Sequence, residues 1–95
     1  MRKGTITEYM PQGEENAVTS SELAKLLECT ERDVSREINR LRKDGEIICS
    51  CGSGYFLPAT DYDIKKFVRQ MQSRIKDIKK ATESAKKYLT EKGLL

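Results

Sequence analysis

The 95-residue chain contains no histidine, and this absence excludes several kinds of active site. The Ser/His and Cys/His pairs that activate nucleophiles cannot form, and a four-ligand zinc site within one chain would need carboxylates. The sequence also lacks a glycine-rich phosphate loop and a metalloprotease motif of the HExxH type. We therefore expect no enzymatic activity, no cofactor and no bound metal.

Long apolar runs are missing as well. No stretch approaches the roughly 18 apolar residues of a membrane span, and the charged N-terminus lacks the apolar core of a signal peptide. These features predict a cytoplasmic protein with no membrane partner.

Cysteine is scarce and odd in number, which argues against a disulfide framework. Cys49 and Cys51 lie two residues apart, so a strand would place both thiols on one face, where they could sense oxidants or metal. Small, buried, apolar side chains are the simpler interpretation of all three cysteines, Cys29 included.

Residues 19–58 carry the strongest local signals. Thr19 and Glu22 have the spacing of a capping box, in which each side chain bonds the other residue's amide. The helix that follows has an apolar stripe, and Glu28-Cys29 forms a short turn after it. The stripe consists of Leu23, Leu26 and Leu27.

A second helix is expected over residues 30–44. Thr30 precedes it, Glu31 and Asp33 place negative charge at the positive end of its dipole, and Gly45 supplies a left-handed stop. The residues expected to face the core are Val34, Ile38 and Leu41.

The opposite face of this second helix is basic and rich in hydrogen-bond donors. At about 100° per residue, it carries Arg32, Ser35, Arg36, Asn39, Arg40 and Lys43. Arginine can bind guanine bidentately, asparagine can bind adenine in the same way, and both reach phosphates. The alternative is ordinary solvated charge on a surface helix.

A β-hairpin is expected next, with strands at residues 46–50 and 55–57 around the turn Cys51-Gly52-Ser53-Gly54. Ser50 and Ser53 could contact phosphate or the minor groove, although a simple tight turn explains the tip equally well. The fold class is therefore mainly α with a small hairpin wing, a winged helix-turn-helix, followed by a long helix.

The segment LLECTERDVSREINRLRKDGEIICSCGSGYFLP resembles the N-terminal winged-helix domain of the biotin repressor family. The resemblance rests on the wing return, formed by Gly52, Gly54, Tyr55, Leu57 and Pro58. It implies major-groove recognition by the residues Arg32, Ser35, Arg36, Asn39 and Arg40. No part of the chain corresponds to the ligase domain, so biotin chemistry is not implied. A lone winged helix with a charged tail is also similar to small prophage proteins of Gram-positive bacteria.

Residues 1–59 are expected to form the DNA-binding domain. Its N-terminal part could hold a short helix at residues 6–10 and a minimal strand at 17–18. The helices and the wing should interlock through a core of Leu26, Val34, Ile38 and Leu41, with Tyr55 or Phe56 from the wing.

Residues 60–95 predict one long amphipathic helix, with acidic residues at its start and Gly93 near its end. Its stripe runs through Ile64, Phe67, Met71, Ile75, Ile78, Thr82, Ala85 and Leu89, close to a heptad repeat with one irregularity. A dimer interface is expected over Met71, Ile75, Ile78, Thr82, Ala85 and Leu89. The alternative is a helix that folds back as a cap on its own domain.

Charge is distributed unevenly between the halves. Residues 1–59 hold 8 Lys/Arg and 10 Asp/Glu, a balance of −2, and residues 60–95 hold 10 and 5, a balance of +5.

Taken together, these features predict a homodimer that binds double-stranded DNA sequence-specifically and regulates transcription. The alternative is a winged-helix module for protein–protein interaction in a replication or regulatory assembly.

Overall fold

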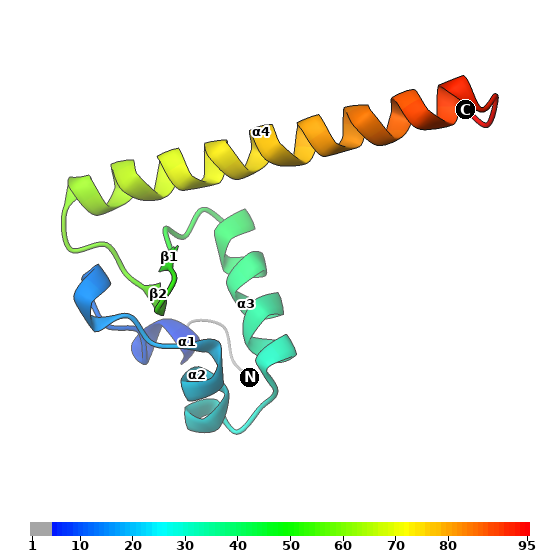
Figure 1. Ribbon diagram of the computed structural model, residues 1–95. Helices are drawn as coiled ribbons and strands as arrows, with labels where there is room; N and C mark the ends of the chain where they lie inside the picture. The colour runs from blue at the N-terminus through cyan, green and yellow to red at the C-terminus, as the bar shows by residue number, and fades with distance from the viewer. Residues whose placement is uncertain (1–4) are drawn as a thin grey trace. The chain divides into compact units, whose positions relative to one another are not determined.

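The structure is a computed structural model that describes residues 5–95. In chain order it contains α1 (Thr5–Glu8), a 3-10 turn η1 (Glu14–Asn16), α2 (Ser20–Leu27), α3 (Glu31–Lys43), β1 (Cys49–Cys51), β2 (Gly54–Phe56) and α4 (Asp61–Glu91) (Figure 1). The predicted fold class, a winged helix-turn-helix followed by a long helix, is confirmed. The chain divides after Lys65 into two compact units.

Helices α2 and α3 form the helix-turn-helix, joined by a turn of Glu28, Cys29 and Thr30. Glu28 takes the left-handed conformation (φ 53°) that glycine adopts more easily, and the Cys29 amide bonds the Ala24 carbonyl at 3.0 Å. The tight turn brings the apolar faces of α2 and α3 together, as the sequence predicts.

Hydrogen bonds at the helix starts differ from the expectation. The Glu22 amide donates to Thr19 Oγ1 at 3.1 Å, which is one half of the predicted capping box. The complete box lies at α3, where the Asp33 amide donates to Thr30 Oγ1 and the Thr30 amide donates to Asp33 Oδ2, both at 3.1 Å. Asp33 can close it because its short carboxylate reaches back one turn.

The core draws on α1 as well as on the helix-turn-helix. Its buried members are Ile6, Met10, Leu23, Ala24, Val34, Ile38, Leu41 and Ile48. The weak helical signal at residues 6–10 thus marks core residues, although α1 itself ends at Glu8.

The prediction that Leu26 belongs to this core is wrong, because 54% of the residue is exposed. At about 100° per residue, Leu26 lies roughly 100° from the centre of the face that Leu23, Ala24 and Leu27 turn inward.

The hairpin is shorter than predicted. Cys49 pairs with Phe56 and Cys51 with Gly54, which leaves Gly52 and Ser53 as the turn. The expected strand over residues 46–50 is wrong at its start, because Glu46 closes the end of α3 by donating its amide to the Leu41 carbonyl at 3.0 Å.

The wing contacts the rest of the domain where Tyr55 and Gly54 lie against Val18. Val18 and Tyr55 exchange two backbone hydrogen bonds, at 2.9 and 2.7 Å, which confirms a minimal strand at Val18. At Gly54 (φ 128°) a Cβ atom would overlap the Val18 carbonyl group and lie 2.8 Å from the Thr19 nitrogen. Only glycine fits this close approach of two backbones.

Helix α4 starts where predicted. The Asp63 carboxylate accepts the Ala59 amide at 2.9 Å, and the Asp63 amide bonds the Thr60 carbonyl at 3.1 Å. Its end is marked by Gly93 (φ 71°). Within residues 5–95, no helix combines the length and apolar character required to cross a membrane.

Candidate nucleic-acid interface

Helix α3 has two sharply different faces. Val34, Ile38 and Leu41 are at most 1% exposed and hold the helix on the core. The predicted DNA-binding side chains all lie on its exposed surface: Arg32, Ser35, Arg36, Asn39, Arg40 and Lys43. The packing therefore fixes which polar groups α3 can offer to a ligand.

In the capping box at the start of α3, the Asp33 carboxylate is engaged by hydrogen bonds from Thr30. Hydrogen bonds from the Thr30 amide and then from its hydroxyl lower the pKa of this carboxyl below its ordinary value. A carboxylate bound to the helix N-terminus stays ionised at neutral pH. It is held against the backbone at the start of the helix, six residues before Asn39.

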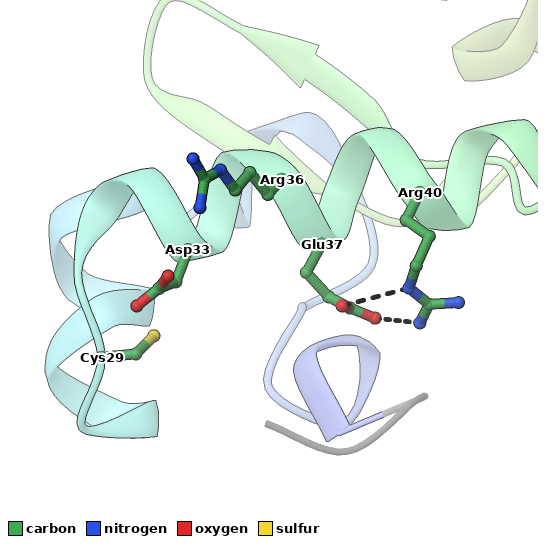
Figure 2. Close-up of a pocket in the computed structure, with 5 residues that line it drawn as sticks. All are labelled: Cys29, Asp33, Arg36, Glu37 and Arg40. Atoms are coloured by element: carbon green, nitrogen blue, oxygen red, sulfur yellow. Dashed lines mark hydrogen bonds and ion pairs between the residues drawn. The ribbon is translucent and has the colours of Figure 1, made fainter.

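Arg40 lies beside two acidic residues of α3, Glu37 and Asp44, and this sets it apart from the other predicted DNA-binding residues. Its guanidinium pairs with the Glu37 carboxylate and with Asp44 Oδ2 at 3.1 Å. The Glu37 hydrogen bond is the main cause of the raised pKa of Arg40. Any phosphate or base that binds Arg40 must compete with two carboxylates, whereas Arg36 projects away from the Glu37–Arg40 pair (Figure 2).

A shallow cavity of about 340 Å³ lies next to Glu37 and Arg40. It is lined by Cys29, Asp33, Arg36, Glu37 and Arg40 (Figure 2). Most of its charged groups already have partners, since Asp33 is bound by Thr30 and Arg40 by Glu37. Its chemistry does not define a ligand, and no sequence pattern predicts this cavity.

Arg42 has a structural role that the sequence pattern does not predict. Its Nε and Nη2 groups donate to the Ile48 carbonyl at 3.0 and 2.7 Å, and Nη2 also donates to Ser50 Oγ at 3.4 Å. The guanidinium carbon lies 5.9 Å from the centre of the Tyr55 ring. Arg42 thus ties the last turn of α3 to both strands of the wing.

A sequence signal for Arg42 does exist in hindsight. The residue follows Leu41 directly and lies four positions after Ile38, so it falls at the edge of the buried stripe. An arginine at such an edge can bury its stem and direct its head group to a nearby carbonyl.

The two predicted wing residues have different environments. Ser53 lies exposed at the tip of the turn, whereas Ser50 is half-buried and accepts the hydrogen bond from Arg42. Ser53 is therefore the more accessible of the two hydroxyls.

The cysteines are free thiols with unequal surroundings. Cys49 is fully buried, and its Sγ lies 4.0 Å from the Asp63 carbonyl oxygen. Burial raises the pKa of this thiol, and the negative charge of Asp63 adds to the effect. Among residues 5–95, no three His, Cys, Asp or Glu side chains are grouped to hold a metal ion.

The predicted dimerisation residues are found on α4, described by itself. Ile75 and Ile78 are 64% and 59% exposed, and Thr82 and Ala85 are also exposed. Met71 and Leu89 are half-buried. Ile75 and Ile78 therefore give this helix an accessible apolar surface.

Comparison with known proteins assigns the N-terminal unit. A family model described as HTH domain matches residues 2–56, more than half of the chain. No curated protein and no solved structure matches the chain. The match supports DNA binding and transcription regulation, and proteins with such domains are typically not enzymes. On the evidence of its helix-turn-helix and of this match, the chain belongs to the HTH domain family.

Proposed function

We propose that the chain binds double-stranded DNA sequence-specifically, with α3 in the major groove, as a transcription regulator of bacterial or phage type. The observation that carries the proposal is the exposed basic face of α3, whose other face is locked into the core by Val34, Ile38 and Leu41. A helix held in this way presents a rigid set of donors, which base recognition requires.

Arg36 and Asn39 are the best candidates for base contacts. They lie about one turn apart on the exposed face, and their side chains match the bidentate edges of guanine and adenine. Arg32 and Lys43, at the two ends of that face, suit phosphate contacts that set the register. Arg40 contributes less, because Glu37 and Asp44 compete for its guanidinium.

The wing supplies a second, sequence-independent contact in this proposal. The exposed Gly52-Ser53 tip offers a hydroxyl and backbone amides to a phosphate, and it carries no acidic group that would repel the backbone. Through Arg42, the wing is attached to the last turn of α3 and keeps a defined position beside it.

Helix α4 serves as the association surface. A homodimer through Met71, Ile75, Ile78, Thr82, Ala85 and Leu89 is the simplest assembly, and its two α3 helices would bind a palindromic site. A second candidate function, a protein–protein module without DNA binding, is favoured by the exposed Ile75 and Ile78 and by the −2 balance of residues 1–59.

Selection of bound sequences from a random duplex pool tests the proposal directly. A recovered motif whose binding weakens steeply with salt supports it, because neutralisation of phosphates releases counterions. Recovery of unselected sequence, or binding that does not respond to salt, would favour the protein–protein module. A palindrome would support a homodimer, and a single half-site would indicate another assembly.

A further inference from the structure

Helix α4 carries an unbroken heptad repeat. The repeat runs through Val68, Met71, Ile75, Ile78, Thr82, Ala85 and Leu89, with spacings that alternate between three and four residues. The stripe predicted from the sequence is irregular at Phe67, and it becomes regular with Val68 in that place. Val68 is 44% exposed. We call these seven residues the seam.

The polar member of the seam fits an apolar contact. The Thr82 hydroxyl donates to the Ile78 carbonyl of its own helix at 2.9 Å. Since its hydrogen-bond donor is already used, Thr82 can turn its methyl group to a partner helix with a small desolvation cost. Thr82 therefore does not interrupt the apolar surface that the exposed Ile75 and Ile78 form within the seam.

The positions that border the seam are basic or neutral. They are Lys65, Phe67, Gln72, Arg74, Lys79, Ala81, Lys86 and Tyr88, and we call them the flanks. Between residues 64 and 89 the acidic residues are Asp77 and Glu83, and both fall on the outer side of the helix. The flanks thus carry the basic residues Lys65, Arg74, Lys79 and Lys86 and no acidic residue.

A second copy of α4 is a poor match for these flanks. In a parallel pair, Arg74 of one chain would face Lys79 of the other, because flanking residues meet five positions apart. In an antiparallel pair each flank meets its own equivalent, so basic residues again face basic or neutral ones. Like charges at such positions destabilise the pair.

We propose that α4 binds an amphipathic helix of a different protein, with Asp or Glu at its flanking positions, in preference to a second copy of this chain. Such a helix would cover the seam with apolar side chains and pair with Arg74, Lys79 and Lys86. This inference rests on the association role proposed for α4, and it changes the partner from a second copy to an acidic helix.

The test uses the full chain and two synthetic heptad-repeat peptides. Both have Ile and Leu in the seam positions, and they differ only in carrying Glu or Lys at every flanking position. We expect the full chain to bind the Glu peptide at least about tenfold more tightly than the Lys peptide. The affinity for the Glu peptide should fall as salt is added, because screening weakens attraction between opposite charges.

Charge-reversal variants locate the effect. Arg74→Glu together with Lys79→Glu should remove or reverse the preference for the Glu peptide. Lys76→Glu together with Lys80→Glu makes the same change of net charge on the outer side of the helix and should leave the preference intact. Circular dichroism confirms that each variant keeps its helix content.

Three results would overturn the inference. The first is equal binding of both peptides, or binding of neither. The second is a chain that sediments as a dimer at low salt, at concentrations lower than those at which the chain binds the Glu peptide. A second copy of the chain would then be the partner of α4. The third is equally tight binding of a Glu-flanked peptide with Ser throughout its seam, which would reduce α4 to a polyanion site. DNA binding through α3 is measured separately with Arg36→Ala, so either proposal can fail alone.

Discussion

Arg42 holds the Ile48 carbonyl oxygen with two N–H groups, at 3.0 and 2.7 Å, and so joins the recognition helix to the wing. The bond is partly buried, and the Ile48 side chain is in the core. A charged donor that satisfies a carbonyl in this position stabilises more than an exposed surface pair.

Arg42→Ala should destabilise the domain by about 1 to 3 kcal/mol, since the Ile48 carbonyl loses its charged donor. It should also weaken binding to the selected DNA, because the wing is no longer attached to α3. Urea unfolding and duplex titration measure the two effects. Arg42→Lys serves as the control, because it keeps the charge but loses the bidentate guanidinium donor. We expect its stability and DNA affinity to lie between those of the parent and Arg42→Ala. Unchanged stability in both variants would contradict the structural role of Arg42.

Gly54→Ala should prevent stable folding or lower the melting temperature strongly. A Cβ at this position overlaps the Val18 carbonyl group, and its φ of 128° is unfavourable for alanine. Gly52→Ala is the matched control, because nothing lies within 4 Å of the added methyl group in the same turn. Thermal melts of the two variants should differ widely, and equal melting temperatures would mean that the wing does not lie against Val18.

Leu23→Ala and Leu26→Ala compare the same substitution on one helix. Leu23 is fully buried and Leu26 is 54% exposed. We expect the first variant to lose about 2 to 5 kcal/mol of stability and the second less than about 1 kcal/mol. Urea unfolding of both decides between the structure and the sequence-based assignment, which placed both leucines inside. A larger loss at Leu26 would reverse the orientation of α2.

Arg36→Ala should weaken binding to the specific site by about 1 to 3 kcal/mol and leave the melting temperature nearly unchanged. Arg40→Ala should have a smaller effect on DNA affinity, because Glu37 and Asp44 already engage this guanidinium. Titration of the selected duplex and of a scrambled duplex separates specific from nonspecific loss. Equal affinity of the Arg36 variant and the parent for every duplex would remove α3 from the proposal.

Cys49 should make stability sensitive to alkali. Burial raises the pKa of its thiol in the folded state, so its contribution is fully present below the unfolded pKa of about 8.5 and is lost as pH rises through the folded pKa. The stability difference between parent and Cys49→Ala should therefore shrink from pH 8 towards pH 10. Urea unfolding at several pH values measures it, and a difference that stays constant would contradict the raised pKa. Cys51 should react with a thiol reagent before Cys49 does.

The sequence by itself determined the helices and the fold class, because their signals are local. The start signal at Thr30, the apolar stripe of α3 and the stop at Gly45 all lie within residues 30–45, so they act without contacts from the rest of the chain. The same periodicity assigned the exposed face of α3 correctly, since burial of one side of a helix fixes the other side.

Only the tertiary structure decided which side chains meet across elements. The sequence placed Leu26 inside and gave no weight to Met10, because one helix's period cannot show which part of its stripe a neighbour covers. The engagement of Arg42 with Ile48, and the need for glycine at position 54 beside Val18, depend on residues that folding brings together from separate segments. Periodicity describes one element at a time, and these relationships depend on the distances between elements.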